Sequence, residues 1–158
     1  MNGLLTSLAS LLAVLSSLLG LQQLRQAPAS SLATTTLAIG NANIIVEIVD
    51  TDAARTRGLS GRATLGENRG MLFVFDTTTY QSFWMKDMSF PIDIIWLDDN
   101  WRVVDITQNI LPPSTSLGTG NFFLKTYSPR APARYVLEVN AGFIAAHKIT
   151  IGEQIVQP

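Results

Sequence analysis

Three short apolar runs between Gly70 and Asp99 constrain the fold of this chain more than any other feature. They read Gly70-Met71-Leu72-Phe73-Val74-Phe75, Ser82-Phe83-Trp84-Met85-Lys86 and Phe90-Pro91-Ile92-Asp93-Ile94-Ile95-Trp96-Leu97-Asp98. Each run has the length and composition of a β-strand. Lys86 and Asp93 occupy positions within the runs where plain core residues would be expected. The segment therefore predicts a β-rich core with a charged spot built into it.

Length and composition limit what the chain can form. With 158 residues, of which 47% are hydrophobic, it suffices for one compact domain and an N-terminal extension, but not for two full domains. Lys and Arg are scattered and the formal net charge is −1, so the basic surface that nucleic-acid binding usually requires is missing. The sequence contains no cysteine, which excludes disulfide bonds, thiolate zinc sites and cysteine nucleophiles.

The first 29 residues differ in character from the rest. Leu4–Leu21 carries no charged side chain and approaches the ~18–20 apolar residues that cross a bilayer as a helix. Ala27-Pro28-Ala29 then offers the small residues of a cleavage site. We expect residues 1–29 to form an apolar helix that serves as a signal peptide or membrane anchor. The protein would then be exported (periplasmic or extracellular) or membrane-anchored, and the alternative is a cytoplasmic chain with a loosely packed first helix.

Residues 30–38 read as a linker that leads into the first strand, and residues 39–158 as the folded domain. Residues 36–39 and 44–49 flank Gly40-Asn41, which suits a tight turn, so these runs are expected to form a hairpin. Asp50 or Thr51 is expected to cap a short helix that Gly58 ends.

The remaining patterns predict further short strands and a second short helix. Residues 71–75 are expected to form a central hairpin with residues 83–87, and residues 92–97 an antiparallel pair with residues 102–108. The other expected elements are a surface loop at 111–120, strands at 135–139 and 149–156, and a helix at 141–148. The fold class is thus α+β, with a mainly antiparallel β-sheet or open barrel, short helices at its rim and an N-terminal apolar helix before it.

Lys86 and Asp93 are the first candidates for a functional site. Asp93 shares a strand face with Ile95 and Leu97, so its carboxylate is expected to be at least partly buried and to need a partner. Lys86, across the expected turn, is the nearest candidate. The pair is interpreted as part of a charged ligand pocket or as an acid/base pair. The alternative is a structural ion pair that fixes the register of a hairpin.

Arginine and glutamate side chains extend this polar set. Arg57, Arg62 and Arg134 could form bidentate pairs with Asp93 or Glu138, and such a cluster suits a ligand that bears a carboxylate or phosphate. The structural alternative for each arginine is a loop tied to a strand, or a solvated face.

Aromatic residues could supply a stacking platform for a sugar or another flat ligand, although aromatic side chains at strand spacing also build cores. The residues predicted to bind a ligand are Arg57, Arg62, Trp84, Lys86, Asp93 and Glu138. No catalytic residue is assigned. We expect no cofactor, because the sequence has no recognisable dinucleotide or phosphate loop. We also expect no metal, because the acidic residues at 98, 99 and 105 lack the spacing of a calcium loop.

The chain resembles the DUF192 family, also called UPF0127, over roughly residues 39 to 156. The residues that carry the resemblance are Arg57-Gly58-Leu59, Arg62, Gly70-Met71-Leu72-Phe73-Val74-Phe75, Phe83-Trp84-Met85-Lys86, Pro91-Ile92-Asp93-Ile94 and Pro132-Ala133-Arg134-Tyr135-Val136-Leu137-Glu138-Val139-Asn140-Ala141-Gly142. The chain has Asp87-Met88 where the family more often has an Asn-Thr-like pair. The resemblance implies a small domain from a family without an agreed biochemical function.

Three functions are compatible with these features. The first is an exported or membrane-associated, non-catalytic domain that binds a small molecule, a glycan or an envelope protein through a charged pocket. The second is an enzyme that uses Asp93 or Glu138 as general acid/base, with Lys86 or Arg57 stabilising negative charge. The third is a purely structural interaction domain that recruits a partner at a strand edge.

Overall fold

The computed structural model describes residues 31–113 and 125–157, and Leu32 begins the compact unit described below. The apolar helix expected over residues 1–29 and most of the loop expected over residues 111–120 lie outside the described residues. Within the described residues, no helix is both long enough and apolar enough to cross a membrane.

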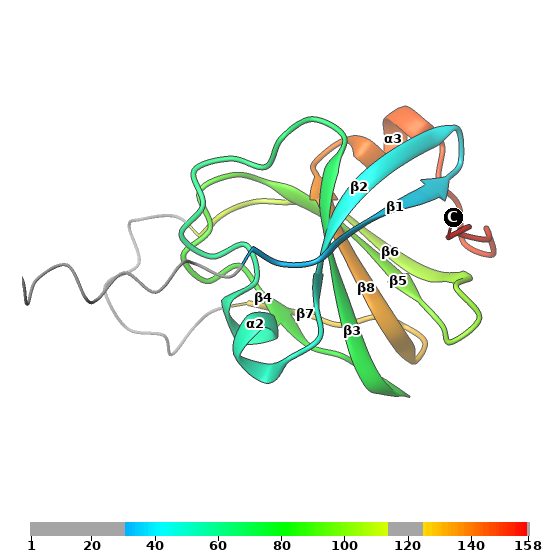
Figure 1. Ribbon diagram of the computed structural model, residues 1–158, viewed down its shortest axis with the longest axis horizontal. Helices are drawn as coiled ribbons and strands as arrows, with labels where there is room; N and C mark the ends of the chain where they lie inside the picture. The colour runs from blue at the N-terminus through cyan, green and yellow to red at the C-terminus, as the bar shows by residue number, and fades with distance from the viewer. Residues whose placement is uncertain (1–30, 114–124, 158) are drawn as a thin grey trace, which may run out of the picture. The chain divides into compact units, whose positions relative to one another are not determined.

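Six strands form one sheet. The elements along the described chain are β1 (Thr34–Ile39), β2 (Ala42–Val49), α2 (Asp52–Arg57), β3 (Arg69–Thr79), β4 (Phe83–Trp84), β5 (Ile92–Leu97), β6 (Val103–Ile110), β7 (Thr126–Tyr127), β8 (Ala133–Asn140) and α3 (Phe143–His147). The sheet has the order β1-β2-β3-β8-β5-β6, and β4 pairs separately with β7 (Figure 1). Only β2 and β3 run parallel; the other pairs are antiparallel. The expected α+β class with a mainly antiparallel sheet is confirmed.

Local sequence signals account for the first elements. β1 and β2 form the expected hairpin around Gly40, whose φ of +58° suits glycine. Thr51 caps α2, since its side-chain oxygen accepts a hydrogen bond from the backbone N–H of Ala54 at 3.3 Å. Gly58 ends α2 with a φ of 48°. The expected pairing of β5 with β6 is also confirmed.

Three expectations about strands are wrong. The runs at 71–75 and 83–87 do not form a hairpin: β3 pairs with β2 and β8, and β4 pairs with β7. The physical reason is Phe83, whose ring packs edge-on against Phe73 at 4.8 Å and against Trp96 at 5.5 Å. Both rings belong to the sheet, so β4 crosses the sheet face instead of extending its edge.

The two remaining corrections concern the ends of the domain. β1 begins at Thr34, earlier than the first strand expected over residues 36–39. The segment 149–156 is not a strand, since it makes only isolated bridges from Gln154 to Arg102 and from Val156 to Ala38. A turn at residues 151 and 152 interrupts the segment, so it cannot form a continuous ladder with a neighbouring strand.

The sheet has an apolar core on each face. One core contains Leu37, Ile44, Val46, Leu72, Ile95, Leu137 and Ile144 of α3, among others. The second contains Leu59, Met71, Phe73, Met85, Ile94, Trp96 and Val136, with Ala54 of α2 packed against it. In Figure 1, α2 lies close to β4 and β7, away from α3. The second core is thus the one that α2 and β4 cover.

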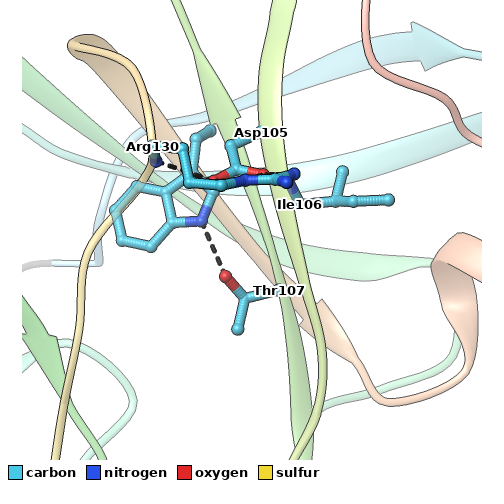
Figure 2. A network of polar contacts seen from close by, with 5 residues as sticks. Asp105, Ile106, Thr107 and Arg130 are labelled. Atoms are coloured by element: carbon cyan, nitrogen blue, oxygen red, sulfur yellow. Dashed lines mark hydrogen bonds and ion pairs between the residues drawn. The ribbon is translucent and has the colours of Figure 1, made fainter.

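A charged network fastens the segment after β7 to the edge strand β6. Figure 2 shows the guanidinium group of Arg130 reaching Asp105, with a shortest N–O distance of 2.6 Å. The Asp105 carboxylate also accepts hydrogen bonds from the backbone N–H of Arg130 and of Ile106. Burial pushes the pKa of Asp105 upward, but these hydrogen bonds outweigh that effect and lower it. The network fixes the chain that leads into β8.

Candidate functional site

A cavity of about 330 Å³ lies on the face of the sheet that α2 and β4 cover. Its walls come from α2 and the three residues that follow it, from Phe73 and Phe75 of β3, and from the β4 segment. Glu138 of β8 and Met88 complete the lining. The cavity therefore joins elements that lie up to 86 residues apart in the sequence.

Glycine shapes the wall that follows α2. A Cβ atom at Gly58 would come within 3.2 Å of the Phe73 ring, and the positive φ of this residue strains other side chains. Two hydrogen bonds then join this wall to the turn after β4: the Ser60 hydroxyl donates to the carbonyl of Lys86 at 2.7 Å, and the Gly61 N–H donates to the carbonyl of Asp87 at 2.9 Å. The segment after α2 is thus held to the turn after β4.

Aromatic rings line the cavity between these walls. Phe83 makes edge-to-face contacts with Phe73 and Phe75, at centroid distances of 4.8 and 6.3 Å. The guanidinium group of Arg55 lies 5.2 Å from the centre of the Phe75 ring. Trp84 is 50% exposed, which is unusual for so large an apolar side chain. The aromatic residues were expected to build either a ligand platform or the core, and both occur. Phe73 and Phe83 belong to the core as well as to the cavity, whereas Trp84 lines only the cavity.

Glu138 contributes a buried carboxyl group to the lining. It lies on β8 between Met71 of β3 and Ile94 of β5, and only 5% of the residue is exposed. Its side chain makes no hydrogen bond or ion pair with any residue that the structure describes. Burial raises the pKa of Glu138 to about 8. The cavity thus contains a carboxyl group that is protonated near neutral pH and that pairs with none of the described residues.

The two arginines in the cavity wall differ in their contacts. Arg55 is fully engaged: it donates to the carbonyls of Asp50 and Val74, and its ion pair with Asp52 is 2.7 Å long. Arg57 is exposed and makes no ion pair within the described part of the chain. Arg57 can therefore contact a bound molecule without first losing a protein partner.

Asp93 does not belong to this cavity, and the predicted ion pair with Lys86 is wrong. Asp93 is buried, as expected, but its carboxylate accepts hydrogen bonds from the backbone N–H of Asn109 at 2.8 Å and of Ile144 at 3.1 Å. These two donors satisfy the charge in place of a lysine. Asp93 fixes the start of α3 against β6, which is a structural role.

The other predicted site residues are distributed over the fold. Arg57, Trp84 and Glu138 are brought together in the cavity. Lys86 contributes its backbone carbonyl to the bond with Ser60 but does not line the cavity. Arg62 forms a bidentate ion pair with Glu47, with both N–O distances at 2.6 Å, in place of the pairs expected with Asp93 or Glu138.

The hydrogen bond from Arg62 is the main cause that lowers the pKa of Glu47. Arg134 lies outside the cavity, with its guanidinium group 5.6 Å from the centre of the Tyr135 ring.

Thr56, Ser60 and Met88 line the cavity but were not singled out in the sequence. The signal that could have found Ser60 is its position directly after Arg57-Gly58-Leu59, the run that carries the family resemblance.

Fold and cavity together define a class: a small α+β domain whose six-stranded sheet carries a carboxyl group in a cavity on one face. Residues 35–157 match DUF192, a family described as "Uncharacterized ACR". The chain belongs to the DUF192 family, which confirms the resemblance.

Individual relatives agree with this assignment. The chain is 30% identical over 112 residues to the UPF0127 protein TK1120 of Thermococcus kodakarensis, which corresponds to 70% of this chain and 62% of that protein. A candidate transcription regulator of Sinorhizobium meliloti has a similar structure, with a TM-score of 0.71 and 26% identity over 80% of this chain and 95% of that one. A protein of unknown function from Novosphingobium aromaticivorans gives a TM-score of 0.67 and 27% identity over 82% and 89% of the two chains.

Proposed function

We propose that this domain binds a small molecule in the cavity formed by α2, Phe73, the β4 segment and Glu138. The observation that carries the proposal is the carboxyl group of Glu138, which is buried without a protein partner among the described residues and lines the cavity. An apolar residue at this position would complete the core between Met71 and Ile94 at no electrostatic cost. Retaining a carboxyl group there is better explained by a ligand that bonds to it.

The size of the cavity favours a small molecule over a protein partner. Its volume of about 330 Å³ is at the lower end of the ~300–1,000 Å³ typical of ligand sites. The aromatic rings of Phe83 and Trp84 supply apolar contact area, and Arg57 supplies a charged group. A glycan or a protein would engage such a site through one protruding group only.

Two Thr→Trp variants test this function. Thr56 lines the cavity and Thr36 lies on β1, and both residues are exposed. We expect Thr56→Trp to fill the cavity and to weaken probe binding by about tenfold or more, while Thr36→Trp leaves it unchanged. The measurement is a chemical-shift titration of the labelled 158-residue chain with 2-phenylethylamine, 2-phenylethanol and 3-phenylpropanoate. Binding of no probe, or binding that Thr56→Trp does not weaken, would contradict the proposal.

A catalytic function is a second candidate that one observation favours. A carboxyl group whose pKa lies near 8 holds its proton at neutral pH and can donate it, as a general acid must. Of the two residues considered for acid/base catalysis, only Glu138 lines the cavity. Both oxygens of Asp93 already accept backbone hydrogen bonds outside the cavity.

We also propose that the domain is exported or membrane-associated through residues 1–29 and has no nucleic-acid partner. The uncharged run Leu4–Leu21 supports the location, and the balance of 11 Lys and Arg against 12 Asp and Glu supports the absence of a nucleic-acid partner. Cell fractionation tests the location: the chain is expected in the membrane or outside the cytoplasm. Recovery of the uncleaved chain from the soluble cytoplasmic fraction alone would overturn this proposal.

A further inference from the structure

The carboxyl group of Glu138 limits what the ligand can be. Its neighbours across β3 and β5 are Met71 and Ile94, which offer no N–H or O–H donor from their side chains. An ionised carboxylate in such surroundings is stabilised only by donors or by a positive charge brought to it. A ligand that binds the ionised form of Glu138 must therefore present donor groups at the point where it contacts this carboxylate.

We propose that the ligand presents a protonated amine to the carboxylate of Glu138, an inference that rests on the small-molecule function proposed above. An ammonium group offers three N–H donors and the compensating positive charge. A hydroxyl group offers one donor and no charge, and a carboxylate would bring a second negative charge to the same place. The amine is thus the group that best offsets the burial of Glu138.

The aromatic lining agrees with this choice. Phe73, Phe83 and Trp84 line the same cavity as the carboxyl group. The faces of aromatic rings attract ammonium groups, most strongly where water is excluded. The rings also provide apolar contact for the body of the ligand, so an amine on an aromatic or aliphatic body fits both features.

The charged groups around Glu138 do not compete with the amine. From α2, Asp52, Arg55 and Arg57 line the cavity, and Asp52 and Arg55 form an ion pair with each other. Arg57 is exposed, so water and salt screen its charge. The residues that face Glu138 from β3 and β5 are uncharged. Arg57 remains able to contact an anionic group at the opposite end of the ligand.

Binding of an amine should release a proton. Burial raises the pKa of Glu138 to about 8, so the carboxyl group of the empty cavity is mostly protonated at neutral pH. When an ammonium group binds, the carboxyl group loses its proton to the solvent and the ligand keeps its own. The affinity for an amine should therefore rise with pH until Glu138 is ionised without a ligand.

Three probes with a similar aromatic body test this inference: 2-phenylethylamine, 2-phenylethanol and 3-phenylpropanoate. We expect the 158-residue chain to bind the amine about tenfold or more tightly than the alcohol, and the carboxylate most weakly. Glu138→Gln should remove the preference for the amine while binding of the alcohol remains. Calorimetry at neutral pH in two buffers with different ionisation enthalpies should show release of about one proton with the amine.

The outcomes separate this inference from the proposed function. If the alcohol or the carboxylate binds as tightly as the amine and Thr56→Trp weakens that binding, the small-molecule function stands and the amine inference is overturned. An amine preference that persists in Glu138→Gln, or amine binding without proton release, also overturns the inference. If no probe binds, or Thr56→Trp has no effect on binding, the proposed function itself fails.

Discussion

Three carboxyl groups are buried in the described part of the chain, and they differ in their hydrogen-bond partners. Asp93 relies on two backbone N–H groups, whereas Asp105 relies on Arg130 and two backbone N–H groups. Glu138 has no such partner among the described residues. The sequence identified Asp93 as a polar residue in an apolar strand and Glu138 as a candidate partner for arginine side chains. It could not identify the partners of Asp93, because Asn109 and Ile144 contribute backbone groups, which every residue carries.

Replacing Glu138 with Gln should change the pH dependence of stability. Burial raises the pKa of Glu138 from 4.5 to about 8, so between these values the folded protein binds a proton that the unfolded chain releases. This group therefore lowers the free energy of unfolding by up to ~1.4 kcal/mol per pH unit as the pH rises. Glu138→Gln removes that loss, so the variant gains stability relative to the wild type toward about pH 8.

Chemical denaturation across this pH range measures the difference between variant and wild type. Glu67→Gln makes the same exchange at an exposed residue and serves as the control. A difference between Glu138→Gln and the wild type that is constant with pH would contradict the prediction.

Asp93→Ala should destabilise the domain without any dependence on Lys86. The substitution leaves the N–H groups of Asn109 and Ile144 without their acceptor, which should cost about 2–4 kcal/mol. Lys86→Met should change the free energy of unfolding by less than ~1 kcal/mol. Denaturation of both single variants and the double variant should give a coupling energy near zero. A coupling above about 1 kcal/mol would show that the two side chains interact after all.

At the scale of elements, the sequence predicts those elements that residues close together in the chain determine. The β1–β2 and β5–β6 hairpins and the caps of α2 follow from turn and capping residues close to the strands and helix they define. The position of β3 between β2 and β8 does not follow from such nearby residues, because β8 lies about 65 residues further along the chain. The same limit applies to the cavity, since α2, β4 and β8 come together only through long-range packing.

Gly58→Ala should distort the end of α2 and the adjoining cavity wall. The new methyl group would approach the Phe73 ring to 3.2 Å, in a backbone conformation with positive φ. We expect a loss of about 1–3 kcal/mol in the free energy of unfolding, together with weaker probe binding.

Gly61→Ala provides the matched comparison for this element. Gly61 also has a positive φ, but no atom lies within 4 Å of the position that its Cβ would take. Thermal and chemical denaturation should show a smaller loss for Gly61→Ala than for Gly58→Ala. Equal losses would mean that the contact with Phe73 has no effect.

At the scale of the whole molecule, the folded unit should not need the residues before Leu32. A chain that begins at Leu32 retains β1, whose Leu37 and Ile39 are buried in the core. A chain that begins at Gly40 loses both side chains and the pairing with β2, which should cost roughly 3–6 kcal/mol. This loss is comparable to the total stability of many domains. Circular dichroism and thermal melting should show a cooperative transition for the first chain only.

Residues of the short β4–β7 pair can shape the cavity without also maintaining the hydrogen-bonded ladder of the main sheet. Trp84 lies on this short pair, outside the hydrogen-bonded ladder of the six-stranded sheet, and half of it is exposed to solvent. A substitution at Trp84 therefore changes the contour of the cavity while every ladder pair of the main sheet stays in register. Under the small-molecule function proposed above, a substitution at this position would alter which ligand fits the cavity at little cost to folding.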